Sequence, residues 1–290
     1  MTIVESALER ARELVDGSQS RAIAPGFPRT MPTPVPIAPV AQPRIPQVRL
    51  RSQAMKLDLG VCRENRLLLA PTEHDDGAVA AYRMLRTRLL HRIRQQKWTT
   101  IGITSTAPEE GKTLTALNLS FSLAREKNSE IILLDLDMRN PSICKALDLT
   151  PPRELRDFFE QPSAPDDLFF SIGVDNLALA GQNTSTAQAS ELLASSRFED
   201  LVGYIKDTTV NPIVLIDLPP VLSTDDVLVL APRLDAVLLV VAEGKTERGA
   251  LDKATELLSE FPLAGVVLNQ SRARGGSYAY GYDAYGQQAR

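Results

Sequence analysis

The segment TAPEEGKT (106–113) lies between an apolar run and a helical pattern, and it contains Gly111, Lys112 and Thr113 in the order of a phosphate-binding P-loop. In such a loop, backbone amides at the positive end of a helix hold phosphate oxygens, the lysine reaches the β- and γ-phosphates, and the hydroxyl ligates Mg²⁺. The match is incomplete, because Thr106 stands where the full pattern has glycine. Gly-Lys-Thr could also simply open a helix, so this segment alone leaves both interpretations open.

Acidic residues end two further apolar runs. Asp135 and Asp137 alternate with apolar residues in ILLDLDMRNPS, and Asp217 follows four apolar residues in IVLIDLPP. Carboxylates this close repel each other unless a cation or a proton intervenes, and a nucleotide with Mg²⁺ would supply the cation. Each acidic residue could by itself be an ordinary cap. Together with the P-loop, in this chain order, they predict an ATP site.

The elements that must position these residues alternate along the chain from about residue 76. Six apolar runs are typical of buried strands: 100–105, 131–137, 176–181, 212–218, 236–242 and 264–269. Helical patterns include 77–96, 112–127 and 246–260. Continuous apolar strands separated by helices predict an α/β fold, a P-loop NTPase with a mainly parallel sheet covered by helices on both faces. Ligands in such sheets lie at the carboxyl ends of the strands.

Four of the six tyrosines lie close to the C-terminal end of the chain: Tyr278, Tyr280, Tyr282 and Tyr285. Small residues and an aspartate separate them, with no period that would bury one face. A packed core uses tyrosine sparingly, because a buried hydroxyl needs a partner. The pattern predicts a flexible, tyrosine-rich tail over residues 275–290, which by composition alone could also be merely disordered.

Composition excludes several classes of protein. With 290 residues, 43% hydrophobic, and a net charge of −4, the chain can form a sizeable core and does not have the charge of a protein that coats nucleic acid. Cys62 and Cys144 lie far apart without a metal-ligand pattern, which fits a reducing cytoplasm. The apolar run 236–242 is too short to cross a bilayer, and the N-terminus lacks a signal-peptide pattern. We expect a cytoplasmic protein with no nucleic-acid partner.

The first 75 residues differ from the rest in composition and in the pattern of their apolar residues. Residues 1–17 predict a short amphipathic helix, with Thr2 and Glu5 as a capping box and Gly17 as a stop. Its polar face is mostly acidic, so docking to a protein partner is favoured over anchoring to anionic lipid, although an idle helix is also compatible. Residues 18–75 read as a linker, because eight prolines between 18 and 50 remove the amide donors that a helix or central strand needs.

Taken together, these motifs resemble those of the bacterial tyrosine kinases that govern capsule and exopolysaccharide synthesis, of the cytoplasmic type separate from its membrane adaptor. The matching segments are AYRMLRT, PEEGKT as Walker A, LLDLDMRNPS as Walker A′, VLIDLPPVLSTDD as Walker B, GVVLN and the tyrosine-rich tail. The resemblance covers residues 76–290. The short helix and the proline-rich linker further resemble the autokinases found beside exosortase systems.

The resemblance implies a kinase domain over 76–274 and assigns roles to residues. Catalytic residues would be Lys112, Asp135 and Asp137. Residues that bind ATP would be Glu109, Glu110, Gly111, Lys112, Thr113, Leu114, Arg139 and Asn269, the last as an adenine contact. Mg²⁺ would be held by Thr113, Asp135 and Asp217. The phosphoacceptors would be Tyr278, Tyr280, Tyr282 and Tyr285.

The resemblance also implies partners. These are a membrane adaptor of the chain-length-determinant or co-polymerase kind, a protein tyrosine phosphatase, and further copies of the chain, so that tails reach neighbouring active sites. Recruitment to the inner face of the membrane would pass through the adaptor.

Two residues depart from the family pattern and keep alternatives open. Ala80 replaces the glutamate that precedes the assembly arginines Arg83 and Arg86, so we expect weak self-assembly. Glu109 replaces a glycine and would repel a triphosphate unless it points outward.

One alternative function is that of an ATPase of the partitioning or division-site type, although Ala107 stands where those proteins have lysine. The other is a non-catalytic regulator that binds ATP.

Overall fold

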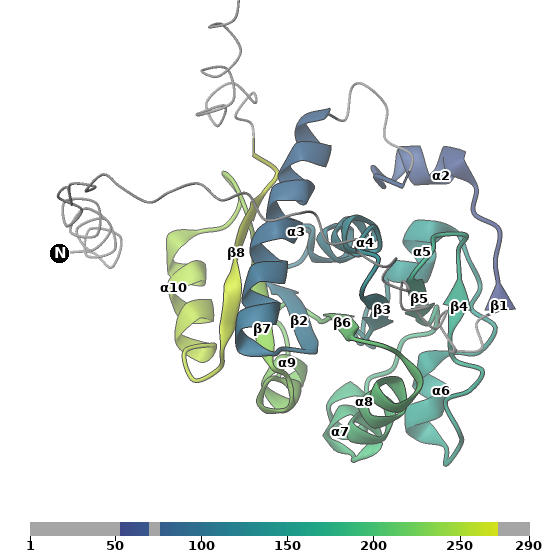
Figure 1. Cartoon of the computed structure of the whole chain (residues 1–290). Helices are drawn as coiled ribbons and strands as arrows, with labels where there is room; N and C mark the ends of the chain where they lie inside the picture. Colours follow the sequence, from purple (N-terminus) through teal and green to yellow (C-terminus); the bar gives the residue numbers. More distant parts are fainter. Residues whose placement is uncertain (1–52, 70–75, 272–290) are drawn as a thin grey trace, which may run out of the picture. The chain divides into compact units, whose positions relative to one another are not determined.

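The computed structural model describes residues 53–69 and 76–271 (Figure 1). Its strands are β1 Gln53–Ala54, β2 Thr100–Ser105, β3 Glu130–Asp135, β4 Phe170–Ser171, β5 Leu177–Ala180, β6 Pro212–Asp217, β7 Ala236–Ala242 and β8 Leu263–Asn269. Its helices are α2 Leu59–Glu64, α3 Asp76–Gln96, α4 Lys112–Leu123, α5 Ile143–Leu147, α6 Leu155–Glu160, α7 Ala189–Ala194, α8 Arg197–Thr208, α9 Asp226–Leu230, the 3₁₀ helix η2 Ala231–Arg233 and α10 Arg248–Leu257.

The strands form one sheet in the order β1-β4-β5-β3-β6-β2-β7-β8. Every neighbouring pair is parallel except β4 with β5. The central strands β2, β3 and β7 are buried along their whole length, as expected when helices cover both faces of a parallel sheet. The six strands predicted from apolar runs and the mainly parallel sheet are therefore confirmed.

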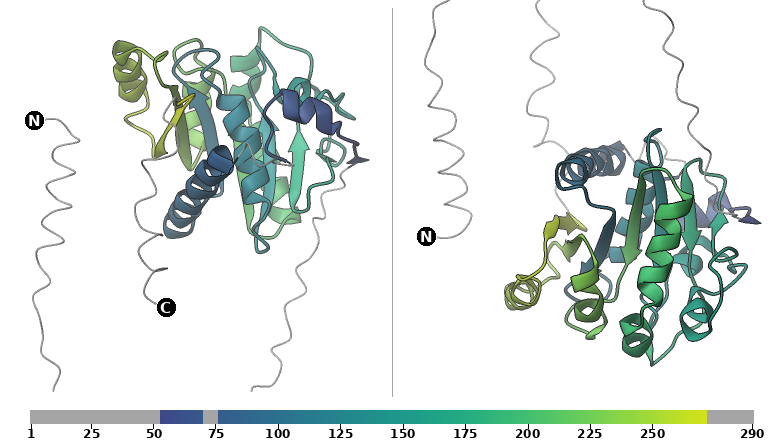
Figure 2. Two further views of the ribbon diagram at one scale, coloured as in Figure 1. Left: turned by 90° about the horizontal axis from the view of Figure 1, so that it is seen from above. Right: turned by 60° about the horizontal axis from the view of Figure 1, so that its bottom comes forward.

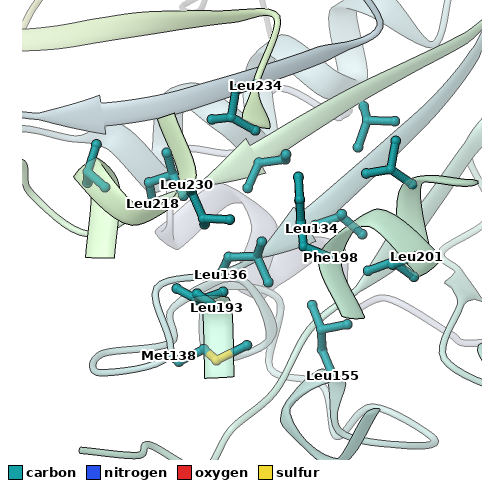
Figure 3. Packing of buried hydrophobic residues seen from close by; sticks show 14 of the residues in the cluster. Leu134, Leu136, Met138, Leu155, Leu193, Phe198, Leu201, Leu218, Leu230 and Leu234 are labelled. Carbon is teal, nitrogen blue, oxygen red and sulfur yellow. The ribbon is translucent and has the colours of Figure 1, made fainter. Parts of the chain in front are cut away.

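Alternate residues of each strand face two different cores. From β3, Ile132 and Leu134 belong to one core, while Ile131 and Leu133 belong to the other. The first core is completed by α6 to α10, and Figure 3 shows part of it, including Leu134. The second is completed by α2 to α5. Helices thus lie on both sides of the sheet, as can be followed in Figure 2.

The folded domain begins earlier than the sequence predicts. Residues 53–69, placed in the linker by their position after the prolines, contain β1 and α2. β1 pairs with β4, and Cys62 and Leu67 are buried in the second core. Asp58 caps α2 by accepting from Gly60 N at 2.6 Å. Two-residue strands and six-residue helices are too short to give a periodic signal, which is why the boundary was missed.

The remaining predictions on domain organisation concern residues that the structure does not describe. The helix predicted at 1–17, the proline-rich residues 18–52 and the tail 275–290 lie outside the described residues. Within the described ranges, none of the helices has the length and apolarity needed to span a bilayer.

Candidate active site

The predicted site residues meet at one edge of the sheet. β6 lies between β3 and β2, so the loops that follow these three strands are neighbours. Asp135 ends β3, Asp217 ends β6, and the two are register partners in the parallel ladder. The loop that follows β2 leads directly into α4, which begins at Lys112. The sequence-based expectation that the strand ends form one site is met for Lys112, Thr113 and the carboxylates.

The turn before α4 is held closed by the side chain of Glu110, which is only 1% exposed. Its carboxylate accepts from the backbone amide of Thr106 at 2.8 Å and from that of Ala107 at 3.1 Å. It also accepts from the hydroxyls of Thr106, at 2.6 Å, and Thr246, at 2.5 Å. Four donors therefore satisfy the hydrogen-bonding capacity of this buried side chain. Glu110 therefore shapes the loop from inside and its carboxylate is directed into the loop.

Both the backbone conformation at position 111 and the close approach of Asn269 require a glycine there. Its φ of 91° lies in the left-handed region, which favours glycine. A Cβ on Gly111 would lie 2.0 Å from Asn269 Nδ2. That nitrogen donates to Glu110 O at 2.9 Å, so the end of β8 is attached to the P-loop. This contact was not foreseen. The adenine contact expected of Asn269 stays a prediction, and Asn269 is not one of the described residues that line the cavity discussed below.

Lys112 lies close to the carboxylates of Asp137 and Asp217, and the charge of Asp135 also acts on it. Its Nζ is 2.7 Å from Asp137 Oδ2 and 3.5 Å from Asp217 Oδ1, and both acids are almost fully buried. Burial opposes the charge on the ammonium, but Asp217 and Asp137 outweigh it and raise the pKa of Lys112 to about 12. The lysine therefore carries a positive charge at the point where the strands end.

Asp135 and Asp217 are less well satisfied than Glu110. Asp135 Oδ2 accepts from the backbone amides of Ser142 and Ile143, both at 2.9 Å. Its Oδ1 has no hydrogen-bond partner among the described residues, and neither does Asp217 Oδ1, despite the nearby ammonium. Burial raises the pKa of both carboxyls, and the charge of Asp217 raises that of Asp135 further. Two buried oxygens thus remain open to a cation or a donor.

Thr113 completes a set that fits Mg²⁺. Its Oγ1 donates to Asp217 Oδ2 at 2.6 Å. Across residues 53–69 and 76–271 no group of three or more His, Cys, Asp and Glu side chains is arranged to hold a metal ion. In nucleotide sites, Mg²⁺ is bound by one or two carboxylates together with a hydroxyl, water and substrate phosphates. Asp217 contacts Thr113, Asp135 is its register partner on β3, and one oxygen of each acid has no hydrogen-bond partner among the described residues, which fits such an ion.

Lys112, Thr113 and Asp137 line a cavity of about 560 Å³, within the range of small-molecule sites, whereas Asp135 and Asp217 lie outside its lining. The predicted residues that line it are Glu109, Gly111, Lys112, Thr113, Leu114, Asp137 and Arg139. Further lining residues are Asn65, Leu67, Pro108, Leu117, Asn140, Ser142, Ala146, Pro219, Pro220, Ser223 and Thr224. Asn65 and Leu67 belong to the segment assigned to the linker, and no motif marked them as site residues.

Two charged residues at the cavity rim are already paired. The exposed Glu109 carboxylate lies 3.1 Å from Lys245 Nζ, which also donates to Glu109 O at 3.2 Å, so its charge is directed away from the P-loop turn. Arg139 donates through Nε to Asp226 Oδ2 at 2.8 Å and through Nη2 to Ser190 Oγ at 2.8 Å. Although burial opposes it, the guanidinium holds the pKa of Asp226 below its ordinary value. The predicted contact of Arg139 with ATP stays a prediction.

Two curated relatives of the chain are named tyrosine-protein kinases. The chain is 28% identical over 222 residues to tyrosine-protein kinase YwqD of Bacillus subtilis, covering 76% of the chain and 92% of that protein. It is 27% identical over 217 residues to tyrosine-protein kinase ptk of Acinetobacter johnsonii, covering 75% of the chain. The chain spans only 29% of the length of ptk. No family model matches the chain.

Solved structures that are similar to the chain include two tyrosine kinase domains. The BceF tyrosine kinase domain has a TM-score of 0.61 at 26% identity, covering 76% of this chain and 93% of that one. The kinase domain of the Escherichia coli tyrosine kinase ETK has a TM-score of 0.64 at 23% identity over 74% of this chain and 84% of that one, a likeness of fold. The P-loop and the paired strand-end aspartates thus occur in a chain that is similar in sequence and in fold to bacterial tyrosine kinases.

Proposed function

We propose that the protein is an ATP-dependent tyrosine autokinase that phosphorylates its own C-terminal tyrosine cluster and regulates capsule or exopolysaccharide synthesis. The observation that carries the proposal is that Lys112, which lines a cavity large enough for a nucleotide, lies beside the carboxylates of Asp137 and Asp217. Relatives named tyrosine-protein kinase support the choice of a phenolic acceptor.

The reaction would be phosphoryl transfer. The phenolic oxygen forms a bond to the γ-phosphorus, the bond from that phosphorus to the β–γ bridging oxygen breaks, and ADP leaves. Lys112 would pair with phosphate oxygens and balance the charge that develops on the leaving group. Asp137, which lines the cavity, would accept the phenolic proton. Most of the acceleration would come from positioning and charge neutralisation, since phosphoryl transfer needs little covalent help from the protein.

Mg²⁺ would be held by Thr113 and Asp217, with Asp135 beside them, and it would supply neutralisation of phosphate charge. Asp135 is fixed by the amides of Ser142 and Ile143 at the start of α5. Thr113 is fixed by Asp217. The protein's own contribution is to hold these oxygens in place before the nucleotide arrives.

We further propose that tails act on neighbouring copies and that self-assembly is weak. Arg83 is exposed on α3. Arg86, in contrast, donates through Nη1 to Ser122 O at 2.9 Å, so one of its donors is already bonded within the domain. Ala80 offers no carboxylate to a neighbouring copy. A chain-length-determinant or co-polymerase adaptor would bring the kinase from the cytoplasm to the inner face of the membrane, and a tyrosine phosphatase would reverse the modification.

Mass spectrometry of the purified chain, with and without MgATP, tests the function. We expect phosphate on Tyr278, Tyr280, Tyr282 and Tyr285. Converting these four to phenylalanine should remove most of the phosphotyrosine while ATP binding persists. Lys112→Met should reduce phosphotyrosine by at least about a hundredfold, as loss of a group that stabilises developing charge does. Tyr82 and Tyr204, which are partly buried on α3 and α8, serve as internal controls and should stay unmodified.

Each alternative has its own result in this experiment. ATP hydrolysis without phosphotyrosine would indicate the partitioning type of ATPase. ATP binding without hydrolysis or transfer would indicate a non-catalytic regulator. Normal labelling of the four-phenylalanine variant would contradict the proposed acceptors.

A further inference from the structure

A second cavity, of about 680 Å³, lies at the amino ends of the strands, at the opposite edge of the sheet from the candidate active site. Thr99, Ser129 and Asn211, which directly precede β2, β3 and β6, belong to its lining. The other lining residues come from the end of α3, the end of α8 and the loops beside them: Leu90, Ile93, Arg94, Lys97, Trp98, Asn128, Lys206, Thr209, Pro212 and Ile213. We refer to it as the amino-edge cavity. Neither the candidate active site nor any sequence motif described above includes these residues.

The amino-edge cavity is positively charged. Arg94, Lys97 and Lys206 line it, and none of the described residues that line it is acidic. Among the described residues, neither lysine has an ion-pair partner. Arg94 Nη2 lies 3.4 Å from Glu126 Oε2, but the arginine side chain is 66% exposed, so water weakens this pair. Three cations without an acid among them suit a ligand that carries negative charge.

Lys97 stands at a backbone position that favours glycine. Its φ is 59°, in the left-handed region. The next residue, Trp98, donates its backbone amide to Ile93 O at 3.1 Å, which is the hydrogen bond that closes a helix when glycine follows its last turn. A side chain in this conformation costs free energy that glycine would not. The turn itself therefore does not account for the lysine, whereas a charge on the cavity does.

The amino-edge cavity also has an aromatic and an apolar surface. Trp98 is the single tryptophan of the chain, and it is partly buried against the second core. Three lining side chains belong to that core and are at most 7% exposed: Leu90, Ile93 and Ile213. The cavity thus combines a flat indole ring and aliphatic groups with cations. That combination suits a phosphate ester of an aromatic ring, because the ring can stack while the phosphate accepts charge-assisted hydrogen bonds.

We infer that the amino-edge cavity binds an aromatic phosphate ester, and that this ligand is a phosphotyrosine of the chain's own C-terminal cluster. The inference rests on the proposed function, which supplies the ester. A phosphotyrosine carries about −1.5 to −2 charges at neutral pH, which complements the three cations. The seven-residue strand β8 spans about 23 Å, and the 14 positions from Ser271 to Tyr285 span up to about 50 Å when extended. The tail is therefore long enough to pass from one edge of the sheet to the other. A tail bound there leaves the active site free for the next acceptor.

Because Trp98 is the single tryptophan, its fluorescence reports binding at the cavity itself. The full chain, with its four tail tyrosines replaced by phenylalanine, is titrated with a peptide of residues 276–290 that carries phosphate on Tyr282 and Tyr285. We expect a saturable change in fluorescence. The unphosphorylated peptide should bind at least about tenfold more weakly, since it lacks the charge-assisted hydrogen bonds. The same peptide with phosphoserine at both positions should bind about fivefold more weakly, because it lacks the rings.

Variants of lining residues locate the binding. Lys206 is exposed on α8, so Lys206→Ala should fold normally and bind the phosphotyrosine peptide about tenfold more weakly. Lys253→Ala is the matched control, because Lys253 is equally an exposed helix lysine, on α10, and does not line the cavity. It should bind within twofold of the parent chain. Trp98→Leu, followed by the anisotropy of labelled peptides, should lose about fivefold for phosphotyrosine and nothing for phosphoserine.

Three results would overturn the inference and leave the proposed function standing. Equal binding of the phosphoserine peptide would mean that the cavity does not recognise the ring. Binding that Lys112→Met weakens and Lys206→Ala does not would place the phosphotyrosine in the candidate active site. A chain that phosphorylates its tail yet binds no phosphopeptide would have no such site.

Failure of the proposed function gives a different result. A chain that forms no phosphotyrosine with MgATP would overturn that function and, with it, the tail as the ligand, even if the synthetic phosphopeptide binds.

Discussion

Buried carboxylates occur in two neighbouring regions of this domain, and the two are satisfied to different degrees. In the P-loop turn, Glu110 accepts from backbone amides and hydroxyls on both sides of the loop. At the ends of β3 and β6, one oxygen each of Asp135 and Asp217 lacks a hydrogen-bond partner within the described part of the chain. A buried polar atom without a partner costs about 1–3 kcal/mol, and more when charged.

The difference distinguishes an acid that holds the loop in place from acids that have an oxygen available for a ligand. The role of Glu110 is structural, because its carboxylate accepts the hydrogen bonds that close the turn before Gly111 and Lys112. Asp135 and Asp217 have raised pKa values because burial disfavours their charge. Carboxylates kept in that state are typical of sites that receive a cation or a proton. The following variants test this contrast, from the largest expected effect to the smallest.

Glu110→Ala should have the largest effect on stability. It removes the acceptor of the Thr106 and Ala107 amides and of two hydroxyls, which then lie buried without a partner. Breaking a buried, charged network in this way typically costs about 3–5 kcal/mol. Chemical denaturation should show that loss, and MgATP binding should be lost with the turn. Glu110→Gln, which keeps one acceptor oxygen, should lie in between. A fully stable Glu110→Ala would contradict the structural role.

Asp135→Asn should act in the opposite direction and raise the unfolding temperature of the nucleotide-free protein. The amide oxygen can still accept from Ser142 and Ile143, and the variant no longer has to protonate a buried carboxyl whose pKa burial raises to about 8. The gain should be on the order of 1–3 kcal/mol at neutral pH, together with loss of phosphotyrosine. Asp137→Asn is the matched control. It removes the 2.7 Å contact with Lys112 and should not stabilise. Destabilisation by Asp135→Asn would refute the contrast.

Asp226→Asn should have the smallest effect, and a pH-dependent one. The pKa of Asp226 is lowered by Arg139 and Ser190 against the effect of burial, so its folded value lies below its unfolded value. The stabilisation is then complete above the unfolded pKa of about 4 and is lost as pH falls through the folded pKa. Because Arg139 is about one third exposed, we expect about 1 kcal/mol. The deficit of the variant should therefore be full at neutral pH and shrink below about pH 4. A deficit independent of pH would mean that the charge is not what matters.

The sequence alone predicts the order in which the candidate site residues follow the strands. Apolar runs of six or seven residues separated by helical patterns predict a parallel sheet, and the ends of β2, β3 and β6 then place Lys112, Asp135 and Asp217 at one edge. These signals are local, because each depends on residues that are close in sequence. The same local rules failed for residues 53–69, whose strand and helix are too short for a period.

The sequence by itself thus determined the fold class, the P-loop and the set of acids at the strand ends. Only the tertiary structure decided what each side chain contacts. Glu110 turns inward to Thr246, Glu109 turns outward to Lys245, and Asn118 reaches back to Leu68. These partners are separated by 136, 136 and 50 positions along the chain. Contacts over such distances depend on how sheet and helices pack, and no local pattern of residues encodes them.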